Sequence, residues 1–181
     1  SEMPPATATI PEYLNDTYWW AYVHPNAVKF FERQWLVNLI LWGNFAKLRD
    51  AALGALGDAL PGRTLQVACV YGDFTPKMVE RAVGHGVVDV VDVVPAQLAN
   101  LRRKLAIDAP VTLLQRDASN LGIASASYDR VILFFLLHEM PEDVRRNTLA
   151  EALRVLKPGA QLVIVDYHQP SKWHPLRPVM K

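Results

Sequence analysis

Two carboxylates stand where the strand ends of an α/β sheet would hold a nucleotide. Asp92 ends a valine-rich stretch twenty residues after Gly72. An acid at that spacing accepts hydrogen bonds from ribose hydroxyls. Asp117 follows the next apolar stretch, where an acid can accept the exocyclic amine of adenine. The structural alternatives are a helix cap for Asp92 and a turn or cap for Asp117; Asp89 competes with Asp92 but lies inside its stretch.

The loop before Gly72 gives a weaker signal. Ala68 and Gly72 are small enough for a ligand to approach the backbone closely, whereas Val70 and Tyr71 are not. A β-branched residue such as Val70 also resists a positive φ. For the Tyr71 ring, stacking near a ligand and ordinary loop packing are both open interpretations.

Alternating strands and helices must position these residues. After the Pro61–Gly62 turn, the pattern predicts strands over 64–70, 87–93, 111–115, 130–137 and 161–166. It predicts helices over 75–83, 95–106 and 142–156, the last ended by Lys157, Pro158 and Gly159. Such alternation favours a parallel sheet with helices on both faces, which is a Rossmann-like α/β fold. Ligands bind such sheets beyond the carboxyl ends of the strands, where the strand order reverses.

The sequence divides into two predicted segments. Residues 1–60 form an aromatic-rich helical segment, with a helix from about 26 to 56 that is broken near Gly43. Its apolar stripe suits a lid over a ligand, or a helix that only covers the sheet. Residues 61–181 form the nucleotide-binding domain.

Composition narrows the classes of function. A net charge of +1 gives no general attraction to nucleic acid. We interpret Arg102, Arg103 and Lys104 as a solvated helix face. The single cysteine, Cys69, allows no internal disulfide, and no uncharged apolar run approaches the ~20 residues of a membrane span. A cytoplasmic protein is the default expectation.

Several motifs resemble those of class I methyltransferases, especially the enzymes that methylate quinone rings. Residues 67–75 resemble their first motif, and Asp92 matches their ribose-binding acid. Residues 116–118, 127–129 and 153–159 match their adenine segment and the approaches to strands four and five. The resemblance implies a class I methyltransferase fold with an N-terminal helical extension. Against that resemblance we expect the last two strands of the fold to be lacking here, which would leave strand five as an edge.

Two departures from that motif point to a narrower family. Gln66 stands where the motif begins with an acid, and Cys69, Val70 and Tyr71 replace its central glycines. This altered loop, together with the aromatic segment 18–25, is most similar to the rhodoquinone biosynthesis protein family.

That resemblance implies a reaction, a donor and a metal. Members of the family replace a ring methoxy group of ubiquinone by an amino group. S-adenosylmethionine is the amino donor, and a divalent metal, manganese (Mn2+) in particular, assists. The implied cofactor-binding residues are Ala68, Cys69, Val70, Gly72, Asp92, Val93, Gln97, Asp117, Ala118 and Phe134.

The chemistry needs a general base, because the donor's amine must be neutral to attack the ring. His138 follows strand four and is the first candidate for base or metal ligand. Glu139 and Asp166 are candidate oxygen ligands of the metal. Asp166 and Tyr71 are also candidate catalytic residues. The alternatives are a backbone-bonded histidine at 138 and a helix cap at 139.

A quinone substrate implies contact with the bilayer. Tyr18, Trp19, Tyr22 and His24 are candidate substrate residues, since aromatic rings suit the membrane interface. We therefore expect a cytoplasmic protein peripherally associated with the inner membrane, with no nucleic-acid partner and with homo-oligomers possible.

Two other functions stay open: methyl transfer to a quinone or other lipophilic ring, and an inactive module that binds the donor. A dehydrogenase is disfavoured, because the loop lacks the spaced glycines of a dinucleotide fingerprint.

Overall fold

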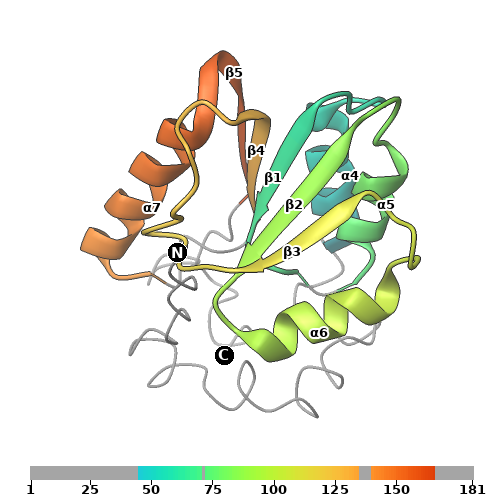
Figure 1. Ribbon diagram of the computed structural model, residues 1–181, viewed down its shortest axis with the longest axis horizontal. Coiled ribbons are helices and arrows are strands. Elements are labelled where there is room, and N and C mark those ends of the chain that lie inside the picture. Colours follow the sequence, from blue (N-terminus) through green and yellow to red (C-terminus); the bar gives the residue numbers. More distant parts are fainter. Residues whose placement is uncertain (1–44, 71, 135–139, 166–181) are drawn as a thin grey trace, which may run out of the picture.

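Five parallel strands form one sheet. The computed structural model describes residues 45–70, 72–134 and 140–165 of the 181-residue chain. The strands are β1 (Arg63–Val67), β2 (Val87–Asp92), β3 (Val111–Gln115), β4 (Tyr128–Phe134) and β5 (Leu156–Val165). Their order is β3-β2-β1-β4-β5, as Figure 1 shows. The chain steps outward from β1 to β3 and returns to β4 beside β1. The order therefore reverses between β1 and β4, which confirms the predicted fold class.

Four described helices cover the two faces of the sheet. They are α4 (Phe45–Leu56), α5 (Phe74–Glu80), α6 (Pro95–Lys104) and α7 (Glu142–Val155). Figure 1 places α7 on one side and the other three on the opposite side. Each strand supplies both layers because its side chains alternate: Val88 and Val90 of β2 pack with α4, α5 and α6, and Val91 packs with α7. The end of α4 lies in this core, so part of the predicted segment 1–60 packs on the sheet.

Element boundaries differ from the prediction where the backbone turns. β1 ends at Val67 rather than at position 70, because Ala68 has a φ of 72° and cannot continue a strand. Lys157, Pro158 and Gly159 were expected to form a turn before the last strand. They lie within the bounds of β5, but its pairing with β4 passes from Tyr128–Leu156 directly to Arg130–Gln161, so these residues form an irregular break in the ladder. Gly159 has a φ of 76°, which accommodates this irregularity.

A charged network joins the amino-terminal ends of the strands, opposite the predicted site. Asp89 accepts hydrogen bonds from the Tyr128 hydroxyl (2.7 Å) and the Arg63 guanidinium (3.0 Å). Asp129 accepts from the Arg63 backbone N–H and from Lys157. Asp89 is thus a structural residue, and it does not compete with Asp92 for a ligand.

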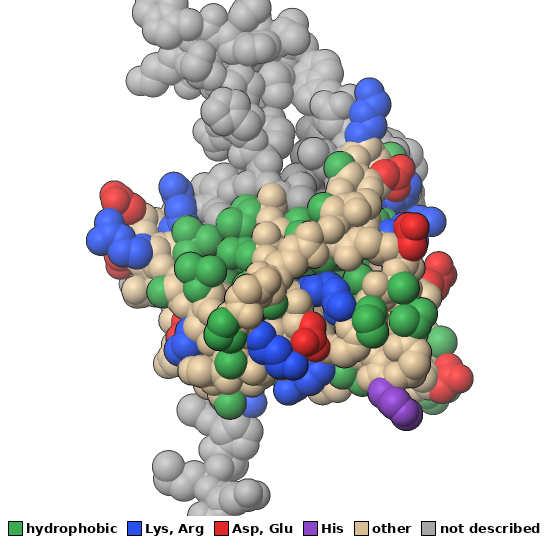
Figure 2. Space-filling view, turned by 90° about the horizontal axis from the view of Figure 1, so that it is seen from above, with side chains coloured by type: hydrophobic (Ala, Val, Ile, Leu, Met, Phe, Trp, Pro, Cys, Tyr) green, Lys and Arg blue, Asp and Glu red, His purple; other side chains and the backbone are tan. Residues whose placement is uncertain are grey.

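The described surface carries both signs of charge. Figure 2 shows acidic and basic side chains interspersed among hydrophobic ones on one face. Among the described residues, no helix is both long and apolar enough to cross a membrane.

Candidate functional site

The carboxyl ends of β1 and β2 are joined by the first residues after β1. We call residues 68–73, which connect β1 to α5, the tip loop. The Ala68 N–H donates to the carbonyl of Val91 (2.8 Å), and the Cys69 N–H donates to Oδ2 of Asp92 (2.8 Å). Ala68, Cys69 and Asp92, all predicted to bind the cofactor, are therefore brought together at the tips of two adjacent strands.

Two of the described residues of the tip loop adopt the left-handed conformation. Ala68 has a φ of 72° and Gly72 a φ of 84°, whereas Val70 has no positive φ and is buried. The valine therefore occupies a position where its β-branched side chain is tolerated. The two small residues that the sequence singled out are thus those with a positive φ among the described residues of the tip loop.

Gln66 is a neutral residue at the position where the methyltransferase motif has an acid, and both ends of its side-chain amide form hydrogen bonds. Its side chain is fully buried. Its Nε2 donates to the Ala68 carbonyl (2.9 Å), and its Oε1 accepts from the Thr75 hydroxyl (2.8 Å). Gln66 thus ties β1, the tip loop and the first turn of α5 together without placing a charge there.

Asp92 lies between the tip loop and the start of α6. Oδ1 accepts from the Val94 N–H (2.9 Å), while Oδ2 accepts from Cys69. Desolvation by burial raises the pKa of this carboxyl, and the hydrogen bonds from Cys69 and Val94 oppose that shift. The N-cap position of α6 is Val94, and Asp92 accepts from the N–H of Val94 itself, two residues on, so Asp92 closes a local turn before the helix. A carboxylate oxygen accepts more than one hydrogen bond, so hydroxyl donors can still be received here.

Asp117 lies past the tip of β3. Its Oδ1 accepts from both the backbone N–H (2.9 Å) and the hydroxyl (2.7 Å) of Ser119. These are the contacts of the turn that the sequence left open as an alternative. Beside it, Ala118 packs against the core on the α7 side. The Arg116 N–H donates to the Asp92 carbonyl (3.1 Å), which keeps the third tip next to the second.

The loop beyond Asp117 is held by α7. Glu151 accepts the Leu121 N–H (2.9 Å) and is itself bonded by Arg154 at 2.8 and 3.0 Å. The bonds from Arg154 hold the pKa of Glu151 below its usual value. The acceptor therefore stays ionised at neutral pH.

The other predicted cofactor residues lie at the same edge of the sheet. The carbonyl of Val93 accepts from Gln115 (3.3 Å), and Gln97 is buried in the first turn of α6. Phe134 ends β4, beside β1.

The predicted catalytic, metal and substrate residues lie outside the described residues: Tyr71, His138, Glu139 and Asp166, and Tyr18, Trp19, Tyr22 and His24. Within residues 45–70, 72–134 and 140–165, no group of three or more His, Cys, Asp or Glu could hold a metal ion. The described residues therefore do not by themselves supply a manganese site.

Residue patterns missed two of the tip loop's partners. Lys104 was interpreted as part of a solvated face, but it is half-buried and donates to the Gly72 carbonyl (2.8 Å). Arg49 of α4 donates to Asp73, the last residue of the loop (2.9 Å). Neither contact has a signal in the sequence, because each joins residues far apart in the chain. Arg102 and Arg103 are exposed, as predicted.

Known proteins with similar sequences act on quinones. The chain is 32% identical over 138 residues to the demethylmenaquinone methyltransferase of Thermus thermophilus, covering 76% of this chain and 61% of that protein. It is 29% identical over 136 residues to the ubiquinone/menaquinone biosynthesis C-methyltransferase UbiE of Syntrophotalea carbinolica, covering 75% and 56%. The chain thus spans about three fifths of the length of these relatives.

The fold has matching solved structures. A SAM-dependent methyltransferase from Aquifex aeolicus superposes with a TM-score of 0.61 at 21% identity, covering 87% of this chain and 80% of that one. The methyltransferase domain model matches residues 64–159, which include the carboxyl ends of β1, β2, β3 and β4. With the sheet order and the tip loop described above, this match shows that the chain belongs to the methyltransferase domain family.

Proposed function

We propose that this chain binds S-adenosylmethionine across the tips of β1, β2 and β3 and transfers a group from it to a quinone ring. One observation carries the donor site: Ala68 and Gly72 hold left-handed conformations in the loop whose Cys69 N–H is bonded to Asp92. Backbone that approaches a ligand closely, beside a carboxylate at the next strand tip, suits a nucleoside with free ribose hydroxyls. The relatives named above support a quinone as acceptor.

Asp92 would receive the ribose hydroxyls and Asp117 the adenine amine. Asp92→Asn should weaken S-adenosylhomocysteine binding by about 10- to 100-fold, since a hydrogen bond to a charged group contributes about 1.5–3 kcal/mol. Asp117→Asn should also weaken it. Asp129→Asn is the matched control, because Asp129 lies at the opposite end of the sheet. Isothermal titration measures all four proteins, and equal affinities in the wild type and both site variants would refute the donor site.

The group transferred is, in the first form of the proposal, the donor's amine, with ubiquinone as acceptor and rhodoquinone as product. The amine attacks the ring carbon that bears a methoxy group, a C–N bond forms, and methanol leaves with the amine's proton. The donor's carbon skeleton is then still attached to the ring nitrogen. Hydrolysis of the bond between that nitrogen and the donor's Cα would release rhodoquinone, with water supplying a proton to the nitrogen and a hydroxyl to Cα. An uncharged amine is needed, and a nearby carboxylate would favour the ammonium form. Gln66 is neutral and its side chain is hydrogen-bonded to Ala68 and Thr75, and Asp73 is paired with Arg49. The described residues of the loop therefore offer no unpaired carboxylate that would favour the ammonium form of the donor's amine, which supports amine transfer.

Methyl transfer to a quinone ring is the second candidate, favoured by the relatives that are C-methyltransferases of quinone biosynthesis. The mass of the product separates the two. Exchange of methoxy for amino lowers the mass of ubiquinone, whereas methylation raises the mass of its acceptor. The chain is incubated with S-adenosylmethionine and either ubiquinone or a demethylated quinone. Each incubation is carried out with and without manganese, and the product masses decide between the two reactions. Donor binding without either product would identify an inactive binding module.

His138 remains the first candidate for the general base. His138→Ala should abolish turnover while leaving donor binding unchanged, with Glu139→Gln, Asp166→Asn and Tyr71→Phe compared in the same assay. Unchanged turnover in His138→Ala would remove that residue from the mechanism.

A further inference from the structure

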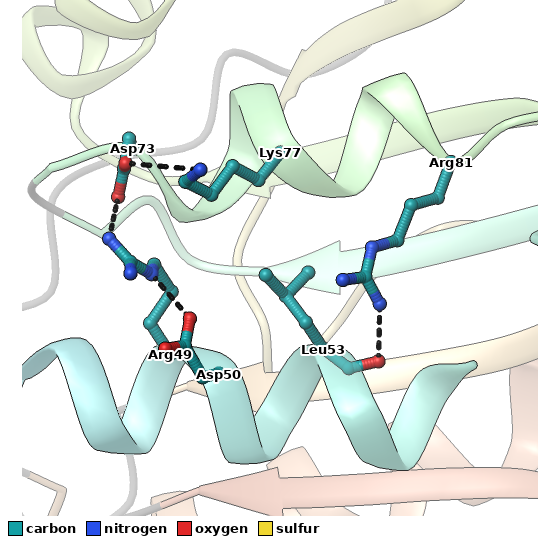
Figure 3. A network of polar contacts seen from close by, with 6 residues as sticks. All are labelled: Arg49, Asp50, Leu53, Asp73, Lys77 and Arg81. Atoms are coloured by element: carbon teal, nitrogen blue, oxygen red, sulfur yellow. Dashed lines mark hydrogen bonds and ion pairs between the residues drawn. The ribbon is translucent and has the colours of Figure 1, made fainter. Parts of the chain in front are cut away.

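The tip loop is held from outside the sheet by a cation of α4. Arg49 lies in the first half of α4, and its Nη1 donates to Oδ1 of Asp73 at 2.9 Å (Figure 3). The Arg49 side chain is 17% exposed and that of Asp73 is 43% exposed, so the contact is partly buried. Lys77 of α5 lies 3.8 Å from the other oxygen of Asp73. Arg49 also bonds Asp50, its neighbour on α4, at 2.9 Å.

The Asp73 carboxylate bonds Arg49 and does not cap the first turn of α5. Asp73 is the N-cap residue of α5, and an aspartate there ordinarily accepts a hydrogen bond from the first turn of the helix. Here it makes no such bond, and its carboxylate turns toward Arg49 (Figure 3). Asp73 directly follows Gly72, the left-handed residue at which the backbone must approach the donor. A change in the Asp73 side chain therefore acts on the part of the loop that the donor contacts.

We infer that Arg49 is a positioning residue for donor binding: by holding the Asp73 carboxylate away from the first turn of α5, it sets the conformation of the tip loop at Gly72. The inference rests on the proposed donor site. It also explains why the tip loop keeps its shape with one glycine, since Arg49 adds from α4 a constraint outside the loop. Asp73 in turn has its charge neutralised, so it does not repel the donor's carboxylate.

The structure contains a matched control for this role. Arg81, the C-cap residue of α5, also joins α4 to α5, because its Nη1 donates to the carbonyls of Leu53 (2.9 Å) and Gly57 (3.0 Å). Figure 3 shows this contact further along the two helices, away from Asp73. Arg49→Met and Arg81→Met each remove one guanidinium between the same two helices. Only the first should alter the loop.

The experiment measures S-adenosylhomocysteine affinity and melting temperature for the 181-residue chain and its variants. Arg49→Met should weaken binding about tenfold, which corresponds to ~1.4 kcal/mol. Arg49→Lys should recover part of the affinity, because a single ammonium donor can still reach the carboxylate. Asp73→Asn removes the negative charge of this side chain, and with it both ion pairs, while the side chain keeps its shape. This variant should weaken binding similarly. The double variant Arg49→Met/Asp73→Asn should bind no worse than either single variant.

The outcomes distinguish positioning from simple helix docking. Arg81→Met should lower the melting temperature yet leave the affinity within twofold of the wild type. If Arg49→Met and Asp73→Asn both lower stability but bind as tightly as Arg81→Met, the role of Arg49 is structural only and the inference is refuted. If the wild type itself binds no S-adenosylhomocysteine, the proposed function fails, and the inference fails with it. Should Arg49→Met not fold, Asp73→Asn and Arg49→Lys decide the question alone.

Discussion

At the scale of single residues, the tip loop depends on an alanine in a conformation that favours glycine. Ala68 has a φ of 72°, and a left-handed non-glycine residue costs roughly 1–2 kcal/mol. The structure retains this residue because the Ala68 N–H and carbonyl are both bonded, to Val91 and to Gln66 respectively. The cost of the backbone conformation is thus offset by two hydrogen bonds that place the loop beside Asp92.

Replacing Ala68 tests this cost directly. Ala68→Gly should raise the free energy of unfolding by up to about 1 kcal/mol, because glycine adopts a positive φ freely. Ala68→Val should lower it by about 2 kcal/mol, because a β-branched side chain is strained there. Ala51→Gly on the exposed side of α4 is the control and should lower stability by about 1 kcal/mol. Urea denaturation measures all three, and a destabilised Ala68→Gly would contradict the argument.

Asp92 and Asp129 should shift stability with pH in opposite directions. Burial raises the pKa of Asp92 above the ordinary 3.8, so its contribution is greatest in acid and is lost as pH rises through its folded pKa. The Arg63 N–H and Lys157 lower the pKa of Asp129, so its contribution is present above 3.8 and is lost as pH falls. The difference in unfolding free energy between the wild type and Asp92→Asn should therefore decrease from pH 3 to 7 (approximate limits). The difference from Asp129→Asn should increase over the same range. Slopes of the same sign would show that one assignment is wrong.

At the scale of elements, α7 holds the segment that follows Asp117. Glu151 is the acceptor for the N–H of Leu121, which is fully buried. The helix thus controls a loop at the opposite edge of the site from α4. Each flank of the proposed donor site is therefore held by a helix on a different face of the sheet.

Removing that acceptor should be costly. Glu151→Ala leaves the Leu121 N–H without its carboxylate and should lower the unfolding free energy by about 1–3 kcal/mol. Glu142→Ala on the same helix removes an exposed pair with Arg146 and should change it by less than about 1 kcal/mol. Thermal unfolding followed by circular dichroism compares the two. Equal losses would mean that the contact with Leu121 contributes no more than an exposed ion pair.

At the scale of the whole molecule, any contact with a membrane should depend on apolar side chains rather than on charge. The net charge of +1 provides little attraction to anionic lipid, and the face seen in Figure 2 carries both acidic and basic side chains. The aromatic residues near the start of the chain are the candidates in the sequence for such contact.

Co-sedimentation with vesicles tests this expectation. The 181-residue chain should bind neutral phosphatidylcholine vesicles, and binding should change little with added salt. Replacing Trp19 and Trp20 with alanine should reduce the bound fraction, while Arg102→Ala should not. Absence of binding by the wild type, or equal binding by the double variant, would contradict a membrane-contact role for this segment.

The sequence alone predicted the α/β class, the strand–helix order and the carboxylates at two of the strand tips. These follow from local properties: alternating apolar stretches give strands, and an acid at the end of a strand lies at the ligand edge of a parallel sheet. The predicted strand 111–115 matches β3 residue for residue. The sequence also identified Ala68 and Gly72 as the residues able to approach a ligand, and both have a positive φ.

Only the tertiary structure revealed which side chains hold that edge in place. It separated Asp89 from Asp92 by giving Asp89 partners from β1 and β4, and it put residues 157–159 inside β5. It also brought Arg49 and Lys104 to the tip loop, from positions 24 and 32 residues away in the chain from the residues that they bond. Hydrophobic periodicity determines which face of an element is buried. Which charged side chain meets which loop depends on how separate elements pack, and no local pattern specifies that.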